Sequence, residues 1–234
     1  MTRIFGLVLL LLAVPLAGDA LAHGVAASDK DLITQGRQFA VFLYLGAKHM
    51  VTGYDHLLFL FGVIFFLYRL KEVALYVTLF AVGHSITLLY AVLSGTHVNP
   101  FIIDAIIGLS VVYKAFDNMG GFTRLLGFQP NTRLAVWIFG LFHGLGLGTK
   151  LQDFSLSADG LVPNILAFNV GVELGQVLGL SAILIAMGFW RRSTGFHRHA
   201  FAANVVVMTC GFILAGYQLV GYLTQMTQIT QMTR

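Results

Sequence analysis

Long apolar segments alternate with short polar segments along this chain, and the pattern predicts membrane-spanning helices. A helix needs about 20 apolar residues to cross the hydrocarbon core of a bilayer. Segments of this kind lie near residues 38–68, 72–93, 98–117, 133–150, 161–189 and 200–223. The first exceeds a simple span and contains Gly46 and Gly53, so we expect it to be tilted, kinked or led by an interfacial turn. The chain ends in Thr224–Arg234, a Thr/Gln-rich stretch with no evident fold.

The first 22 residues have the form of a secretory signal peptide. Arg3 precedes the apolar run Ile4–Leu16, and Ala20-Leu21-Ala22 has the small-x-small form of a cleavage site. Cleavage there would leave a single membrane domain, residues 23–234, that begins at His23. A free amino group beside this imidazole could then bind a metal. An uncleaved first helix is the alternative interpretation.

Basic residues are confined to alternate loops, and this predicts the orientation of the helices. The loops after the first, third and fifth spans carry Arg69, Lys71, Arg124, Arg133, Arg191, Arg192 and Arg198. The loop Ser94–Asn99 has no Lys or Arg, and in the 150–163 loop Lys150 is offset by Asp153 and Asp159. Because short cytoplasmic loops carry the excess of Lys and Arg, we expect the basic loops in the cytoplasm. Both mature termini would then lie on the external side of a bacterial inner membrane.

The composition agrees with a membrane protein. Of the 234 residues, 57% are hydrophobic and 10% are charged, whereas about a quarter are charged in a soluble domain. The net charge of +4 arises in short loops with no basic cluster among aromatics, so a nucleic acid is not indicated as a partner. Cys210 is the single cysteine, which excludes an intrachain disulfide. The predicted fold class is all-α: a polytopic helical membrane protein with about six transmembrane helices in a lipid bilayer.

Several ionisable residues interrupt the apolar spans, although each costs roughly 2.5–3.5 kcal/mol on insertion scales. They are His49, Asp55 and His56 in the first span, His84 in the second, Asp104 in the third, His143 in the fourth and Glu173 in the fifth. Most of them lie near mid-span, so side chains from different helices can meet in one cavity. Imidazoles with carboxylates are ligands for nickel, zinc, copper or iron, and the set therefore predicts a metal site.

The spacing of these residues predicts which helix faces line the site. His49 and His56 are seven residues apart and share one helix face. Asn169, Glu173 and Gln176 also share a face of the fifth span. Three glycines repeat every four residues on roughly the opposite face: Gly171, Gly175 and Gly179. We expect the fifth helix to pack closely through these glycines and to present its polar face to the site.

Other interpretations of the polar residues are open. A lone membrane histidine more often bonds a neighbouring helix than binds a metal, and a set of histidines and carboxylates could relay protons without any metal. Asp55 or Glu173 could orient a histidine instead of binding the ion. Asp104, Asn169 and Gln176 are further candidates for this supporting role.

Five motifs, in order along nearly the whole mature chain, resemble those of the HupE/UreJ-type membrane proteins. They are His49-x5-Asp55-His56 followed by Leu57-Leu58-Phe59-Leu60; Gly83-His84-Ser85-Ile86-Thr87-Leu88; Leu109-Ser110-Val111-Val112-Tyr113; Phe142-His143-Gly144-Leu145-Gly146; and Phe168-Asn169-Val170-Gly171-Val172-Glu173-Leu174-Gly175-Gln176. The resemblance implies a small inner-membrane protein of about six helices. Relatives are regarded as nickel permeases or as accessory proteins of hydrogenase and urease systems.

The resemblance also implies which residues contact the metal. It assigns this role first to His49, Asp55 and His56, and next to the family positions matched by His84, His143 and Glu173. Asp104 stands where many relatives have Glu, and Asp117-Asn118 replaces a Glu-Asn pair. The charge is kept at both places, but the side chain is one methylene shorter.

The sequence thus favours a divalent-metal permease, with nickel the favoured ion and zinc or copper possible. The chain shows no ATP-binding signature and no soluble domain. One alternative is an intramembrane zinc hydrolase that uses three histidines and an open coordination position, although a His-Glu-x-x-His helix is absent from the sequence. Another is a non-transporting accessory subunit that acts with metalloenzyme maturation partners. No catalytic residue is assigned.

Overall fold

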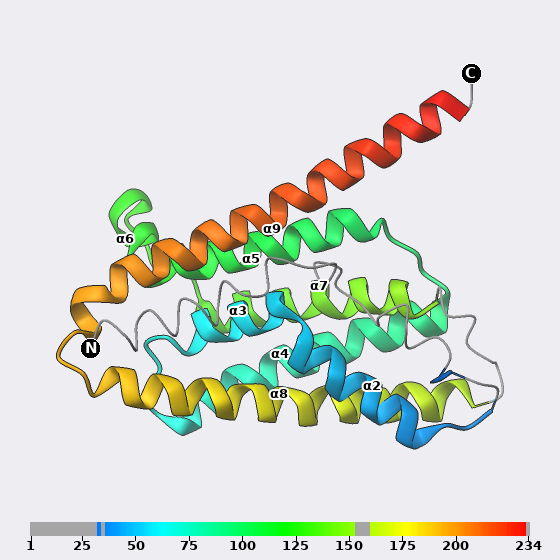
Figure 1. The fold of residues 1–234 in the computed structure, drawn as a ribbon, viewed down its shortest axis with the longest axis horizontal. Coiled ribbons are helices and arrows are strands. Elements are labelled where there is room, and N and C mark those ends of the chain that lie inside the picture. The colour runs from blue at the N-terminus through cyan, green and yellow to red at the C-terminus, as the bar shows by residue number, and fades with distance from the viewer. Residues whose placement is uncertain (1–31, 34–35, 153–159, 233–234) are drawn as a thin grey trace.

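The computed structural model describes residues 32–33, 36–152 and 160–232, and this part of the chain is helical with no strand (Figure 1). The helices are α2 (Phe39–Thr52), α3 (Tyr54–Ile64), α4 (Leu70–Ser94), α5 (Pro100–Asn118), α6 (Gly121–Leu126), α7 (Thr132–Gln152), α8 (Leu161–Arg191) and α9 (Phe196–Met232). The prediction of an all-α fold is confirmed. The expected signal peptide and His23 lie outside the described residues.

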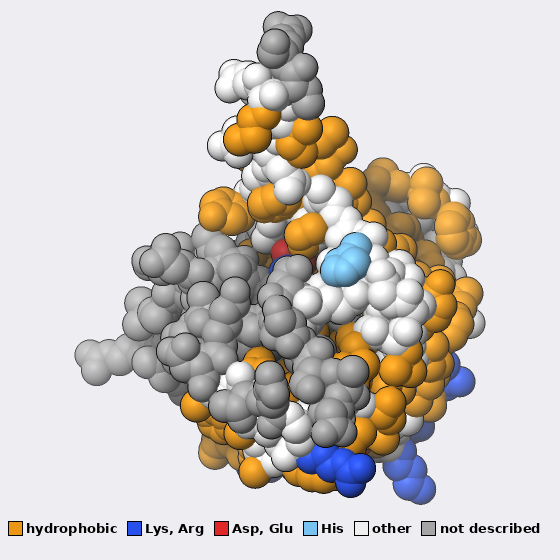
Figure 2. All heavy atoms as spheres, turned by 90° about the vertical axis from the view of Figure 1, so that its right-hand side faces the viewer, with side chains coloured by type: hydrophobic (Ala, Val, Ile, Leu, Met, Phe, Trp, Pro, Cys, Tyr) orange, Lys and Arg blue, Asp and Glu red, His pale blue; other side chains and the backbone are white. Residues whose placement is uncertain are grey.

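Four of the described helices, α4, α7, α8 and α9, are long and apolar enough to cross a membrane. Large apolar side chains cover much of the described surface in Figure 2, and Leu178 and Phe189 of α8 are more than 60% exposed. Such a surface is expected where lipid, rather than water, is the solvent. The protein is therefore a multi-pass membrane protein. The expectation of six spans requires that α5 and the α2–α3 pair also cross, and this stays a prediction.

The long first segment of the sequence forms two helices, α2 and α3, which are separated by Gly53. The backbone of Gly53 is extended (φ −73°, ψ 102°), and its N–H still donates to the carbonyl of His49. A Cβ atom at Gly53 would lie 3.0 Å from the Nδ1 atom of His56 and 3.2 Å from a carboxylate oxygen of Asp55. Glycine thus fits where the chain turns between the two helices.

Side-chain caps and left-handed glycines set other helix ends. The Oδ1 atom of Asn99 accepts hydrogen bonds from the backbone N–H groups of Phe101 and Ile102, and Pro100 begins α5. Gly95 ends α4 in the left-handed conformation (φ 66°). The connection between α4 and α5 is consequently short.

Three helix pairs, α4 with α7, α2 with α8 and α5 with α9, form the most extensive contacts of the bundle. Glycines permit the close approach. A Cβ atom at Gly144 of α7 would collide with the carbonyl of His84 on α4, and one at Gly171 of α8 would collide with the carbonyl of Leu43 on α2. The predicted packing of the fifth span through its glycines is therefore confirmed for Gly171 and also for Gly175, which meets Ala47.

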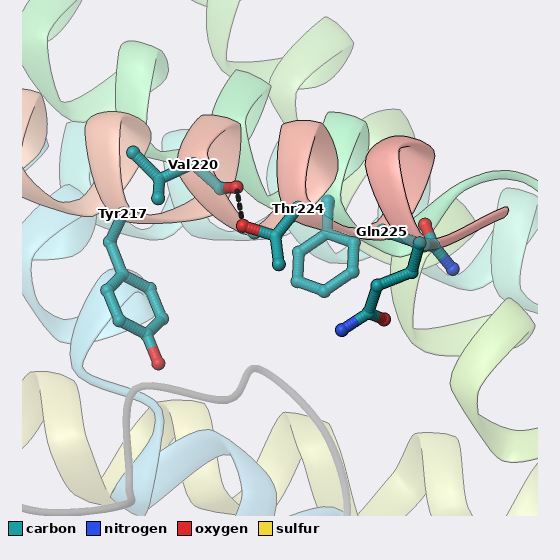
Figure 3. A pocket seen from close by; sticks show the side chains of 7 residues that line it. Tyr217, Val220, Thr224 and Gln225 are labelled. Atoms are coloured by element: carbon teal, nitrogen blue, oxygen red, sulfur yellow. Dashed lines mark hydrogen bonds between the residues drawn. The ribbon is translucent and has the colours of Figure 1, made fainter. Parts of the chain in front are cut away.

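The last helix is longer than the sequence pattern predicts, because the Thr/Gln-rich stretch with no evident fold continues α9 as far as Met232. The hydroxyls of Thr224, Thr227 and Thr230 donate to backbone carbonyls one turn earlier, which satisfies these polar groups within the helix. Figure 3 shows the Thr224 bond to Val220 and the open pocket beside α9. In Figure 1 the end of α9 extends away from the bundle.

The loops predicted to be cytoplasmic lie together at one end of the bundle. Figure 1 places the α3–α4 connection, α6 and the α8–α9 turn at one end, and the α4–α5 connection at the other. The alternation of basic loops in the sequence is thus matched by their arrangement in space. Which end faces the cytoplasm stays a prediction.

We expect Gly171→Ala to destabilise the protein, because the new methyl group would be forced against the α2 backbone. The expected loss is about 1–3 kcal/mol of unfolding free energy, typical of overpacking. Thermal unfolding in detergent measures it. Gly188→Ala on the same helix is the control, since nothing lies within 4 Å of its added Cβ atom. Equal stability of the two variants would contradict the close α2–α8 packing.

Candidate metal centre

The break at Gly53 places Asp55 and His56 in the first turn of α3, inside the bundle. The His56 side chain is completely buried and that of Asp55 is 13% exposed. The Nδ1 atom of His56 lies 2.9 Å from a carboxylate oxygen of Asp55. Because a carboxylate only accepts hydrogen bonds, Nδ1 carries the proton and donates it. This leaves Nε2 of a neutral His56 able to bind a metal, with Asp55 orienting the ring or sharing the ion.

Two further histidines flank the His56 ring. The ring centroids of His49, on α2, and His143, on α7, each lie 4.9 Å from that of His56. The Nδ1 atom of His143 donates to the carbonyl of Phe139 at 2.7 Å, so Nε2 is its metal-binding atom when the ring is neutral. His143 is completely buried and His49 is 3% exposed. Residues from three helices therefore meet at one place.

The described residues contain one group with the geometry to hold a metal ion, formed by Asp55, His56 and His143. One ligand atom from each of these residues lies within 4.8 Å of the others. Metal–nitrogen and metal–oxygen bonds of about 2.0–2.2 Å require somewhat closer ligands. A modest inward movement of the side chains would thus complete a coordination shell, to which His49 could add a fourth ligand.

The helix ends at the break favour a cation beside His49 and a negative charge on Asp55. The last turn of α2 contains His49 and ends in carbonyl groups, which attract a cation. The first turn of α3 carries Asp55, whose negative charge is favourable at a helix N-terminus. The dipoles of α2 and α3 thus stabilise a cation at the end of α2 and the carboxylate of Asp55 at the start of α3.

His84, on α4, lies beside the group but is not within it. Its side chain is completely buried, and neither ring nitrogen has a hydrogen-bond partner among the described residues. The ring of Phe80 stacks on His84 at 6.2 Å and also contacts His143 at 4.8 Å. His84 interacts electrostatically with His49, His56 and His143. Its role as a ligand stays a prediction.

The structure does not bring Glu173 to the histidines. Its side chain is exposed on the outer face of α8, next to the exposed Leu174 and Val177, and it forms no ion pair within the described part of the chain. The polar face of α8 is inside only in part: Asn169 and Gln176 are buried, whereas Glu173 is turned beyond the edge of the buried face. We therefore do not retain the expectation that Glu173 is a ligand of the same site.

Asn169 and Gln176 lie between α8 and its neighbours with part of their hydrogen-bonding capacity unused. The Oδ1 atom of Asn169 accepts from the Ser85 hydroxyl of α4 at 3.3 Å. The side-chain nitrogens of Asn169 and Gln176 are buried and lack partners among the described residues. Phe168, next to Asn169, contacts the His49 ring at 6.2 Å. A supporting role for the two amides stays a prediction.

Asp104 forms an ion pair with a lysine that the sequence pattern did not indicate as its partner. The Nζ atom of Lys150, on α7, lies 2.6 Å from the Oδ2 atom of Asp104, on α5. In the sequence, Lys150 is expected to be a loop charge. Its position seven residues after His143, on the same face of α7, was the available signal.

Other polar side chains, also missed from the sequence, hold the opposite end of α3. The Asn118 side chain of α5 donates to the carbonyl of Gly62 at 2.8 Å and to Asn204 at 3.0 Å. Arg191, at the end of α8, donates to the carbonyls of Ile64 and Phe65. These bonds satisfy carbonyls at the end of a short helix, and they fix α3 and therefore the Asp55–His56 pair at its other end.

Comparison with known proteins identifies the family. The family model described as HupE / UreJ protein matches residues 26–226. Comparisons with curated proteins and with solved structures gave no match. Since the match spans far more than half of the chain, the protein belongs to the HupE/UreJ family.

Binding of Ni²⁺ to the buried group should stabilise the folded protein. At a Ni²⁺ concentration about 100 times Kd, the expected gain is about 2.7 kcal/mol of unfolding free energy. His56→Ala removes the central ligand and should abolish the gain, whereas the exposed loop residue His97 offers the control His97→Ala. Thermal unfolding with and without Ni²⁺ measures the effect. A full gain in the His56→Ala protein would place the metal elsewhere.

Proposed function

We propose that this member of the HupE/UreJ family is a divalent-metal permease, with nickel as the favoured substrate. The observation that carries the proposal is the buried group of Asp55, His56 and His143 at the break between two half-helices. The family is linked to nickel or cobalt transport and to accessory roles for urease and hydrogenase, which supports a metal as the ligand. His49 completes the proposed site, and His84, beside the group, is a further proposed ligand.

The chemistry of the side chains supports the choice of metal. Imidazole nitrogen and carboxylate oxygen suit Ni²⁺, Zn²⁺ and Cu²⁺, whereas Cu⁺ prefers thiolate and thioether sulfur. The group contains no sulfur ligand, and the single cysteine, Cys210, is buried on α9 outside the group. Among the divalent ions, the family link favours nickel over zinc and copper.

The backbone around the site supports movement of the ion rather than permanent storage. Broken helices that present ion ligands near the centre of the bundle are a recurring feature of secondary transporters. The ligand atoms of the group lie within 4.8 Å of one another, close enough to converge on one ion. Because imidazoles bind metal only when deprotonated, protons can replace the ion at acid pH and help its release.

The proposed location is the bacterial inner membrane, with a cleaved signal peptide and external mature termini. The gathering of the basic loops at one end of the bundle supports a single orientation. The substrate would cross toward the cytoplasm, where metalloenzyme maturation partners could receive it. An accessory protein without transport activity would bind the same metal but would carry no flux.

Uptake of Ni²⁺ into proteoliposomes tests transport directly. The double variant His49→Ala/His56→Ala should reduce uptake to the level of empty liposomes, because two of the proposed ligands are removed. His97→Ala, in an exposed loop, should leave uptake unchanged. Uptake by the double variant equal to that of the wild type would refute the proposed site. Binding without any uptake by the wild type would favour the accessory role.

A further inference from the structure

The Asp104–Lys150 pair is a buried ion pair with one carboxylate oxygen left over. Asp104 is 7% exposed and the Lys150 side chain is 16% exposed. Oδ2 of Asp104 binds the ammonium of Lys150, whereas Oδ1 is buried and has no hydrogen-bond partner among the described residues. A buried carboxylate oxygen without a partner is costly. It is therefore a candidate ligand for a second cation.

This pair lies within electrostatic reach of the metal centre. Asp104 interacts with both Asp55 and His56. On α7, His143 precedes Lys150 by two helical turns, and Gly146 lies between them. A Cβ atom at Gly146 would lie 3.9 Å from Oδ1 of Asp104. Gly146, which has no side chain, therefore lies next to Oδ1 of Asp104. It is on the part of α7 between His143 and Lys150.

The charges of the metal centre and of the Asp104–Lys150 pair do not sum to zero when a divalent ion is bound. In the empty protein the charges of Asp55, Asp104 and Lys150 sum to −1. A divalent ion at the histidines would change the sum to +1, and a net charge is unfavourable in the low dielectric of the bundle. If the ammonium of Lys150 withdrew, one divalent ion and two carboxylates would be neutral.

Lys150 lies close to the end of its helix, which favours withdrawal of its ammonium. It lies in the last turn of α7, which ends at Gln152, and Asp104 lies in the second turn of α5, which begins at Pro100. The long apolar stem of a lysine can carry its ammonium toward the polar boundary near a helix end. The carbonyls at the C-terminus of α7 also favour a positive charge there.

We propose that Asp104 is a second cation-binding position, on the path between the histidines and the α4–α5 end of the bundle. In the empty protein the ammonium of Lys150 fills this position as a tethered cation. A divalent ion displaces it, binds Asp104 and passes between this position and the group of Asp55, His56 and His143. The inference rests on the proposed function, since it assigns a further step to the same ion.

Titration calorimetry with Ni²⁺ on the full chain in lipid nanodiscs tests this inference. Lys150→Met keeps the apolar stem and removes the charge, so Ni²⁺ should bind about tenfold more tightly, or as a second ion. Lys150→Arg should bind as the wild type does, and Asp104→Asn added to Lys150→Met should cancel the gain. Lys114→Met is the matched control, because Lys114 also forms a buried pair, with Asp117, at the other end of α5.

A second measurement uses the wild type and does not depend on how the variants fold. Amine-reactive labelling of Lys150, read by mass spectrometry, should become faster when Ni²⁺ is added, whereas labelling of Lys114 should not change. Unchanged labelling of Lys150, or Lys150→Met binding Ni²⁺ as the wild type does, would overturn the second position. If wild-type binding is nonetheless lost in His56→Ala, the proposed function survives. A wild type that binds no Ni²⁺ would overturn both.

Discussion

The interruption of the chain at Gly53 is the constraint on which the rest of this structure depends. In lipid, a backbone that leaves the helix loses hydrogen bonds that lipid cannot replace, so such a break is tolerated where protein surrounds it or where it lines a water-filled cavity. Here Gly53 itself is half-buried and His56, just after it, is completely buried, and side chains of Asn118 and Arg191 hold the far end of α3. In return, the break turns Asp55 and His56 toward the interior, where an unbroken helix would continue along one line.

Close helix packing then brings the remaining ligands to this point. The glycines of α7 allow its backbone to touch that of α4, and His143 of α7 lies beside both His56 and Phe80. The glycines of α8 likewise bring α2 close, and with it His49. Packing without small residues would hold the helices farther apart and would separate the imidazoles. The glycines and the histidines of this chain therefore serve the same arrangement.

Much of this arrangement could be predicted from the sequence, because membrane burial makes ionisable residues conspicuous. The positions of the long helices, the division of the first segment and the candidate roles of His49, Asp55, His56 and His143 all follow from apolar runs and their interruptions. The position of Glu173 could not be predicted in this way: a shared helix face gives the direction of a side chain within its helix, but the rotation of α8 against α2 depends on packing. The role of Lys150 could not be predicted either. A lysine near a helix end is normally interpreted as a loop charge that sets topology, and its partner on α5 is known only from the structure. The helical tail of α9 was missed because polar Thr and Gln residues satisfy a helix without an apolar pattern.

The central claim is that side chains from the broken helix and from α7 bind one ion together. Nickel K-edge X-ray absorption on the Ni²⁺-loaded protein tests this most directly, because imidazole ligands give a distinctive scattering pattern that can be counted. We predict a first shell of nitrogen and oxygen with several imidazoles, and the loss of one imidazole in His143→Ala. A spectrum without imidazole scattering, or one unchanged in both His56→Ala and His143→Ala, would contradict the account.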